Sequence, residues 1–134
     1  MKFLWPLLLL LVSTTTSADW LRIKGADNNA AEKFIETTSI RQTGPMNTMR
    51  RVWEMSNFAK FTADKALSIK TLMEYDCKDR RIRVLEENYF SEHLAKGEAL
   101  TQVGNAVLPS NWSGIDKGST VEAIFYRLCP QDNG

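Results

Sequence analysis

The sequence is poor in residues that build reactive or metal-binding centres, with one histidine and two cysteines among 134 residues. These three residues are too few for the four ligands of a Cys/His zinc site. The two thiols are also too far apart in the sequence to form a CxxC redox motif. The sequence also lacks GxSxG, HExxH and glycine-rich phosphate-binding motifs. We therefore expect no enzymatic activity, no cofactor and no metal.

Long hydrophobic runs are also missing. The longest, Phe3–Val12, has about half of the roughly 20 residues that a membrane-spanning helix needs. It follows Lys2 and precedes small polar residues up to Ala18, which is typical of a secretory signal peptide. We predict a signal peptide over residues 1–18 and a mature domain over residues 19–134. Since no cysteine lies near the predicted cut, we expect an exported protein without a lipid anchor, in the periplasm, on the outer surface or outside the cell.

The chain has almost no excess of charge of either sign, with 17 basic and 16 acidic residues. Removing Lys2 with the signal peptide leaves 16 of each. A neutral chain has no overall field that attracts nucleic acid or an anionic membrane. We therefore expect neither partner, and any electrostatic binding requires a local cluster of charge.

The two cysteines, Cys77 and Cys129, are expected to form a disulfide, because an exported protein meets an oxidising compartment. Closing so long a loop stabilises a domain by about 4 kcal/mol in the chain-entropy model. The alternative is a reactive or metal-binding thiol. It requires a nearby base or further ligands, and only His93 is available.

Most of the mature chain alternates between apolar and polar residues, which predicts β-strands. Residues 67–77 show this best: one parity is apolar, and apart from Leu72 the other is polar, which predicts one buried and one solvated face. Residues 30–33 are also compatible with a short helix. The predicted strands are 19–24, 34–40, 49–55, 67–77, 81–88 and, more weakly, 99–107.

Near the C-terminus the pattern changes to that of a helix. Ser119 and Glu122 form a capping-box pattern, and Pro130 ends the segment. Cys129 lies at the edge of the apolar stripe, and Cys77 lies on the apolar face of its strand, so a bridge between them clamps the helix onto the sheet. We therefore predict an α+β fold, an antiparallel sheet with a C-terminal helix on one face. The apolar stripe consists of Val121, Ile124, Phe125 and Leu128.

Short motifs also follow one another in a specific order along the mature chain. The most specific is Tyr75-Asp76-Cys77, followed after two residues by Arg80-Arg81-Ile82-Arg83. The others are Asp19-Trp20, Phe34-Ile35-Glu36, Arg51-Val52-Trp53, Ser68-Ile69-Lys70, Trp112 with Ile115, and Cys129. In this order the mature chain resembles the surface-adhesin protein E-like domain family of Gram-negative bacteria.

The resemblance implies a six-stranded antiparallel sheet with a C-terminal helix tied to it by a disulfide. It also implies display on the outer surface, non-enzymatic binding of host extracellular-matrix proteins, and a homodimer. This chain has Glu36 where the family usually has Asp. An alternative from another class is a periplasmic accessory or inhibitor protein with no host ligand, which the absence of a lipid-anchor cysteine favours.

The densest cluster of positive charge is the candidate binding site. Lys78, Arg80, Arg81 and Arg83 lie within six positions, interrupted only by Asp79 and Ile82. Arginines in such a cluster bind sulfated polysaccharides or acidic segments of matrix proteins through paired hydrogen bonds. The alternative is that these side chains only pair with carboxylates of the neighbouring strand. If binding by the cluster proves insensitive to salt and to charge reversal at Arg81 and Arg83, the aromatic residues Phe58, Phe61 and Trp112 are the remaining candidates.

The chain offers few acid–base candidates. Glu74 and Asp76 share one strand parity, which is a feature of paired catalytic carboxylates but is more typical of partners for Arg81 and Arg83. No catalytic motif surrounds His93, and we interpret it as a surface histidine in a loop.

Overall fold

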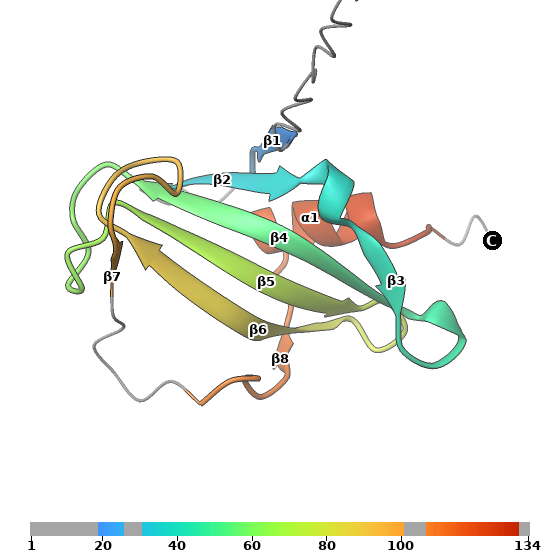
Figure 1. The fold of residues 1–134 in the computed structure, drawn as a ribbon. Helices are drawn as coiled ribbons and strands as arrows, with labels where there is room; N and C mark the ends of the chain where they lie inside the picture. The colour runs from blue at the N-terminus through green and yellow to red at the C-terminus, as the bar shows by residue number, and fades with distance from the viewer. Residues whose placement is uncertain (1–18, 26–30, 101–106, 132–134) are drawn as a thin grey trace, which may run out of the picture.

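The structure, a computed structural model, describes residues 19–25, 31–100 and 107–131. The strands form one antiparallel sheet in the order β1-β2-β4-β5-β6-β7, with the short β3 beside β4 and β8 beside β6 (Figure 1). The helix α1 packs on one face of this sheet. The α+β prediction with a path of six strands is confirmed. The bounds are β1 Trp20–Ile23, β2 Ala31–Glu36, β3 Arg41–Thr43, β4 Met49–Phe58, β5 Ser68–Asp76, β6 Arg81–Phe90, β7 Ala99–Leu100, β8 Ser113–Gly114 and α1 Thr120–Leu128.

The second strand differs from the prediction. β2 begins at Ala31, so the helix considered for residues 30–33 is wrong for its described part, residues 31–33. Pairing of Ala31 with Phe58 and of Lys33 with Ser56 overrides the local helix preference. The predicted strand 34–40 ends early, at Glu36, in a 3₁₀ turn. Most of the predicted strand 99–107 lies outside the described residues, which include only β7 and Val107.

The ladder between β5 and β6 contains a β-bulge. Met73 pairs with Val84, whereas Leu72 pairs with Glu86, so that Leu85 is an extra residue in β6. A bulge exchanges the two faces of a strand beyond it, because side chains alternate with a period of two. Arg81 and Arg83 therefore share a face with Glu86 rather than with Leu85.

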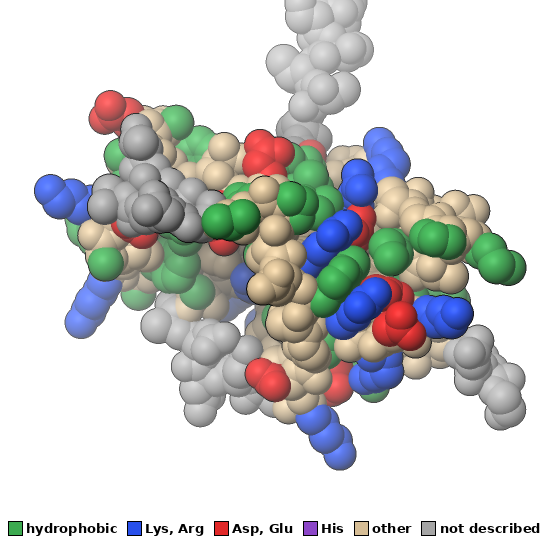
Figure 2. Space-filling model, turned by 90° about the horizontal axis from the view of Figure 1, so that it is seen from below, with side chains coloured by type: hydrophobic (Ala, Val, Ile, Leu, Met, Phe, Trp, Pro, Cys, Tyr) green, Lys and Arg blue, Asp and Glu red, His purple; other side chains and the backbone are tan. Residues whose placement is uncertain are grey.

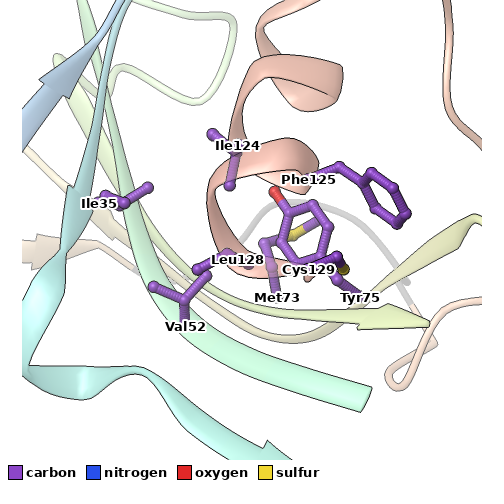
Figure 3. Packing of buried hydrophobic residues seen from close by; sticks show 8 residues of the cluster. All are labelled: Ile35, Val52, Met73, Tyr75, Ile124, Phe125, Leu128 and Cys129. Carbon is purple, nitrogen blue, oxygen red and sulfur yellow. The ribbon is translucent and has the colours of Figure 1, made fainter. Parts of the chain in front are cut away.

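The hydrophobic core lies between α1 and the sheet. Ile35, Val52, Met73 and Tyr75 point from neighbouring strands toward the helix (Figure 3). The predicted stripe of α1 meets them, since its buried apolar residues are those expected, with Val121 half-buried at the edge. These residues of α1 are Ile124, Phe125 and Leu128.

The first turn of α1 is capped nearly as the sequence predicts. The Glu122 amide donates to Ser119 Oγ at 3.1 Å. The Glu122 carboxylate, however, accepts from the amide of Gly118 at 3.1 Å instead of that of Ser119. The Ser119 amide donates instead to the Asp116 carbonyl. Three backbone amides, those of Gly118, Ser119 and Glu122, therefore have acceptors here, whereas the simple capping box satisfies two.

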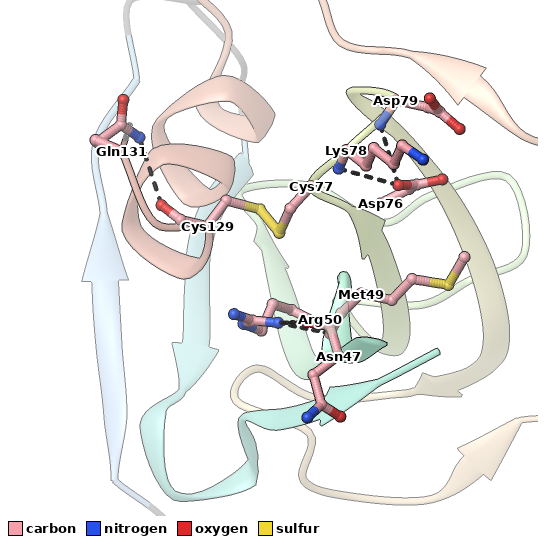
Figure 4. The surroundings of a disulfide bond; sticks show 9 residues. All are labelled: Asn47, Met49, Arg50, Asp76, Cys77, Lys78, Asp79, Cys129 and Gln131. Atoms are coloured by element: carbon pink, nitrogen blue, oxygen red, sulfur yellow. Dashed lines mark hydrogen bonds between the residues drawn. A yellow bond between two sulfur atoms is a disulfide. The ribbon is translucent and has the colours of Figure 1, made fainter. Parts of the chain in front are cut away.

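A disulfide joins Cys77, directly after β5, to Cys129, directly after α1 (Figure 4). Their Cα atoms lie 5.5 Å apart. The turn after Cys77 is held by Asp76 Oδ1, which accepts from the amides of Lys78 and Asp79 at 3.1 Å each. The predicted pairing is confirmed, and it fixes the end of the helix to the end of a central strand.

Removal of the disulfide tests this clamp. Replacing both Cys77 and Cys129 by Ala should lower the free energy of unfolding by about 4 kcal/mol, because the unfolded chain then loses its loop constraint. Urea denaturation of the oxidised wild type and the double variant measures the difference. A loss below about 1 kcal/mol would mean that the bond adds little to the packing of α1.

Phe125→Ala tests the packing of the helix on the sheet. Phe125 is 3% exposed, and removing its ring should lower the unfolding free energy by about 3–5 kcal/mol. Tyr126→Ala is the matched control, because the neighbouring Tyr126 is 45% exposed. Similar losses in the two variants would contradict the assignment of Phe125 to the core.

Candidate functional site

The face of the sheet opposite α1 carries a row of charged residues. Val52 and Tyr75 point into the core, so their strand neighbours Arg51 and Glu74 point to the opposite side. The register places Arg51 opposite Glu74 and Glu74 opposite Arg83. We call this side of the sheet the open face.

Two carboxylates of β5 on the open face are buried under arginines. Glu74 is 1% exposed and Asp76 2% exposed. Glu74 accepts from Arg51 Nε at 2.7 Å and from Arg83 Nε and a terminal nitrogen of Arg83 at 2.9 and 2.7 Å. Asp76 Oδ2 accepts from Arg81 Nε at 2.9 Å. The expectation of a solvated strand face is therefore wrong here, because the long arginine side chains cover the shorter acidic ones.

These arginines hold both carboxylates in the ionised form. Burial by itself raises the pKa of Glu74, but the hydrogen bonds and charges of Arg51 and Arg83 outweigh it and lower that pKa below its ordinary value. Burial likewise opposes ionisation of Asp76, and the Asp79 amide and Arg81 together lower its pKa. Carboxylates kept ionised in this way are poor proton donors. The pair therefore fits the interpretation as ion-pair partners.

Trp112 completes this part of the open face. The guanidinium carbons of Arg81 and Arg83 lie 4.5 and 4.4 Å from the centre of its ring. The side chains of Arg51, Arg81 and Arg83 are 45%, 39% and 29% exposed. We call Arg51, Arg81, Arg83 and Trp112 the arginine–tryptophan face.

The four predicted binding residues do not form one cluster. Arg81 and Arg83 lie together, whereas Arg80 turns to the other side of the sheet and stacks on Phe125 of α1, 4.8 Å from the ring centre. Arg80 also pairs with Glu122 at 3.7 Å. Lys78 is exposed in the turn after β5, with no ion pair to a described residue. Figure 2 shows one side of the molecule, on which basic, acidic and hydrophobic side chains are interspersed.

Arg51 belongs to the arginine–tryptophan face but was not among the predicted binding residues, because it lies some thirty positions before Arg81 in the sequence. The sequence does contain a sign of its position: Arg51 directly precedes the apolar Val52 in a predicted strand, so the two side chains point to opposite faces of the sheet. The three aromatic candidates differ in exposure. Phe61 is 65% exposed, whereas Phe58 and Trp112 are half-buried. His93 is exposed in the loop after β6, as interpreted from the sequence.

A third buried carboxylate, missed in the sequence, lies on the core side of the sheet. Glu54 is 2% exposed and accepts a hydrogen bond from the hydroxyl of Tyr75. Burial raises the pKa of Glu54, although Lys33 Nζ lies 3.9 Å away and the Tyr75 hydroxyl favours the ionised form. Burial and the nearby Glu54 raise the pKa of Tyr75 well above its ordinary value. The sequence sign of this burial was that Glu54 lies two positions after Val52 in the same strand, so both side chains point to the same face of the sheet.

The two glutamates should give stability a pH dependence of opposite sign. A lowered pKa makes the contribution of Glu74 complete above about pH 4.5, and it is lost as the pH falls through the pKa of the folded state. The raised pKa of Glu54 instead makes stability fall as the pH rises from about 4.5 through the higher pKa of its folded state. In Glu74→Gln the free energy of unfolding should therefore fall less steeply as the pH is lowered. In Glu54→Gln the free energy of unfolding should rise relative to that of the wild type as the pH is raised. Urea denaturation between about pH 3 and 8 measures both, and changes of the same sign would contradict this assignment.

Neither membrane spans nor metal clusters occur in the described part of the chain. Its one α-helix is too short and too polar to cross a bilayer. No three His, Cys, Asp or Glu side chains of the described residues gather as metal ligands would.

Comparison with solved structures finds the same fold in protein E of Haemophilus influenzae. Its selenomethionine form matches with a TM-score of 0.64 and 11% identity, over 82% of this chain and 84% of that chain. Its crystal form II matches with a TM-score of 0.63 and 12% identity, over 81% of this chain and 86% of that chain. At these identities the likeness shows the fold alone. No curated protein sequence matches significantly.

The sequence itself provides the assignment to a family. The model of the family described as surface-adhesin protein E matches residues 20–130. This range spans every strand described above, the helix and both cysteines. The chain belongs to the surface-adhesin protein E family.

Proposed function

We propose that this chain is an exported, non-enzymatic adhesin that binds acidic polymers or acidic segments of host extracellular-matrix proteins through the arginine–tryptophan face. The predicted signal peptide over residues 1–18 accounts for export to the periplasm, the outer surface or the medium. The observation that carries the proposal is the set of three guanidinium groups held over two buried carboxylates.

The arrangement leaves hydrogen-bond donors for a ligand. Arg51, Arg81 and Arg83 each direct Nε toward a carboxylate, and their NH1 groups make no hydrogen bond to any described residue. Sulfate and carboxylate groups accept paired hydrogen bonds from guanidinium groups. A ligand therefore meets the arginine ends first, while Glu74 and Asp76 lie beneath them. The exposed Asp79 pairs with a terminal nitrogen of Arg81 at 3.8 Å, so Arg51 and Arg83 are the less compensated of the three arginines at the surface.

The guanidinium groups are also ordered before a ligand arrives. Immobilising a long flexible side chain on binding costs about 0.5–1.5 kcal/mol. The ion pairs and the stacking on Trp112 restrict these side chains in the free protein, so less of this cost remains. Lys78 contributes one further exposed cation in the neighbouring turn, whereas Arg80 is occupied by α1.

Immobilised heparin, a sulfated polysaccharide, tests the proposal with the mature domain. Replacing both Arg51 and Arg81 by Gln should reduce affinity about tenfold or more, and wild-type binding should weaken steeply with salt, because the Debye length falls from about 10 Å at 0.1 M to about 3 Å at 1 M. Arg127→Gln is the matched control, since Arg127 is an exposed arginine of α1 on the other side of the sheet. Thermal unfolding verifies that each variant is folded. Heparin affinity that does not change with salt concentration, or an equal loss of affinity in the double variant and in the control, would contradict the proposal.

Cell fractionation separates this proposal from the periplasmic accessory or inhibitor protein. An adhesin should be accessible to protease on intact cells, whereas the alternative should be recovered only from the periplasm. The resemblance also implies a homodimer, which sedimentation equilibrium of the mature domain measures directly.

A further inference from the structure

A pocket of about 340 Å³ lies on the open face at the far end from the arginine–tryptophan face. Glu32 pairs with Asn57 at the end of β4, whereas Arg51 lies near the start of that strand. The loop over residues 91–98, which joins β6 to β7 (Figure 1), lines the pocket with His93 and Leu94. The pocket is lined by Glu32, Asn57, Phe58, Ala59, His93 and Leu94.

Side-chain hydrogen bonds hold this loop in place. The amide of Leu94 donates to Asn57 Oδ1 at 2.9 Å, and the amide of Ala95 donates to Ser68 Oγ at 2.9 Å. The hydroxyl of Ser68, which is fully buried, donates in turn to the carbonyl of Glu92 at 2.6 Å. The pocket is therefore formed before any ligand binds, as ligand sites usually are.

The loop makes a tight turn at its tip, where the amide of Lys96 donates to the carbonyl of His93 at 3.3 Å. Leu94 and Ala95 have φ values of 59° and 56°, in the left-handed region that residues with a Cβ avoid. A tight hairpin turn between β6 and β7 accounts for these φ values. The turn leaves the side chain of Leu94 46% exposed and places it at the pocket.

The chemistry of the lining selects the ligand. Ala59 and Leu94 provide apolar surface, and Glu32 is the only Asp, Glu, Lys or Arg among the described residues that line the pocket. Glu32 forms no ion pair with a described residue. His93 Nε2 lies 2.7 Å from the carbonyl oxygen of Phe58. Because a carbonyl only accepts, Nε2 carries the proton, and in the neutral ring Nδ1 is left as an acceptor.

We infer that this pocket binds a basic side chain with an apolar stem, a lysine or arginine of a protein partner. The stem contacts Ala59 and Leu94, and the cationic end pairs with Glu32. This site is independent of the arginine–tryptophan face, since the two attract groups of opposite charge at opposite ends of the sheet.

Small probes test the inference by NMR titration of the labelled mature domain. N-acetyl-lysine methylamide should shift the amide signals of Asn57 and Leu94 and bind at least about threefold more tightly than N-acetyl-norleucine methylamide, which has the stem without the charge. The preference is modest because exposed ion pairs are weak. Glu32→Gln should abolish the preference and leave binding of the norleucine probe unchanged.

Two variants complete the experiment. Glu98→Gln removes an exposed acid of the same loop that does not line the pocket, and it should retain the preference for lysine. Leu94→Ala should weaken both probes alike. Equal binding of the two probes by the wild type, shifts confined to other parts of the sheet, or loss of the preference in Glu98→Gln would each overturn the inference. Heparin binding in the Glu32→Gln variant should be unchanged, so failure at one site is distinguishable from failure at the other.

Discussion

The contact between a nine-residue helix and the sheet is the constraint on which this fold depends. A helix of this length is not stable by itself in water, because its few hydrogen bonds do not offset the cost of nucleation. It forms here because Ser119 caps its first turn, Ile124 and Phe125 pack against the strands, and Cys129 is bonded to the end of β5. The sheet depends on the helix equally, because without it Val52, Met73 and Tyr75 would lie in water. Once one face is covered, the alternation of the strands leaves the other face for charged and aromatic side chains.

That open face is polar in an unusual way for a chain whose charges nearly cancel. At the arginine–tryptophan face Glu74 and Asp76 are buried, whereas Arg51 and Arg83 above them are half-exposed. Charges of opposite sign are therefore separated by depth at this end of the sheet. The lowered pKa values of Glu74 and Asp76 keep this separation complete at neutral pH. A count of residues does not reveal this difference in depth.

Much of the fold was predictable because it follows from short-range patterns. The alternation in residues 67–77 identified Met73 and Tyr75 as core residues, and the capping pattern located the start of α1 within one residue. The candidate site was predictable only in part. Arg51 reaches the site through the pairing of β4 with β5, which residues along a single strand do not specify. Arg80 leaves it because its φ of 50° turns the chain just before β6, so the parity of Arg81 and Arg83 does not extend back to it.

The bulge at Leu85 reverses the alternation of side chains between the two ends of β6. Before it, odd-numbered residues lie on the open face, and after it, even-numbered residues do. Loss of one residue at this point would exchange the faces of Asn88 and Tyr89 while leaving Arg81 and Arg83 paired as they are. The side chains that the far end of β6 presents on the open face are therefore set by this one extra residue, independently of the pairing at its charged end.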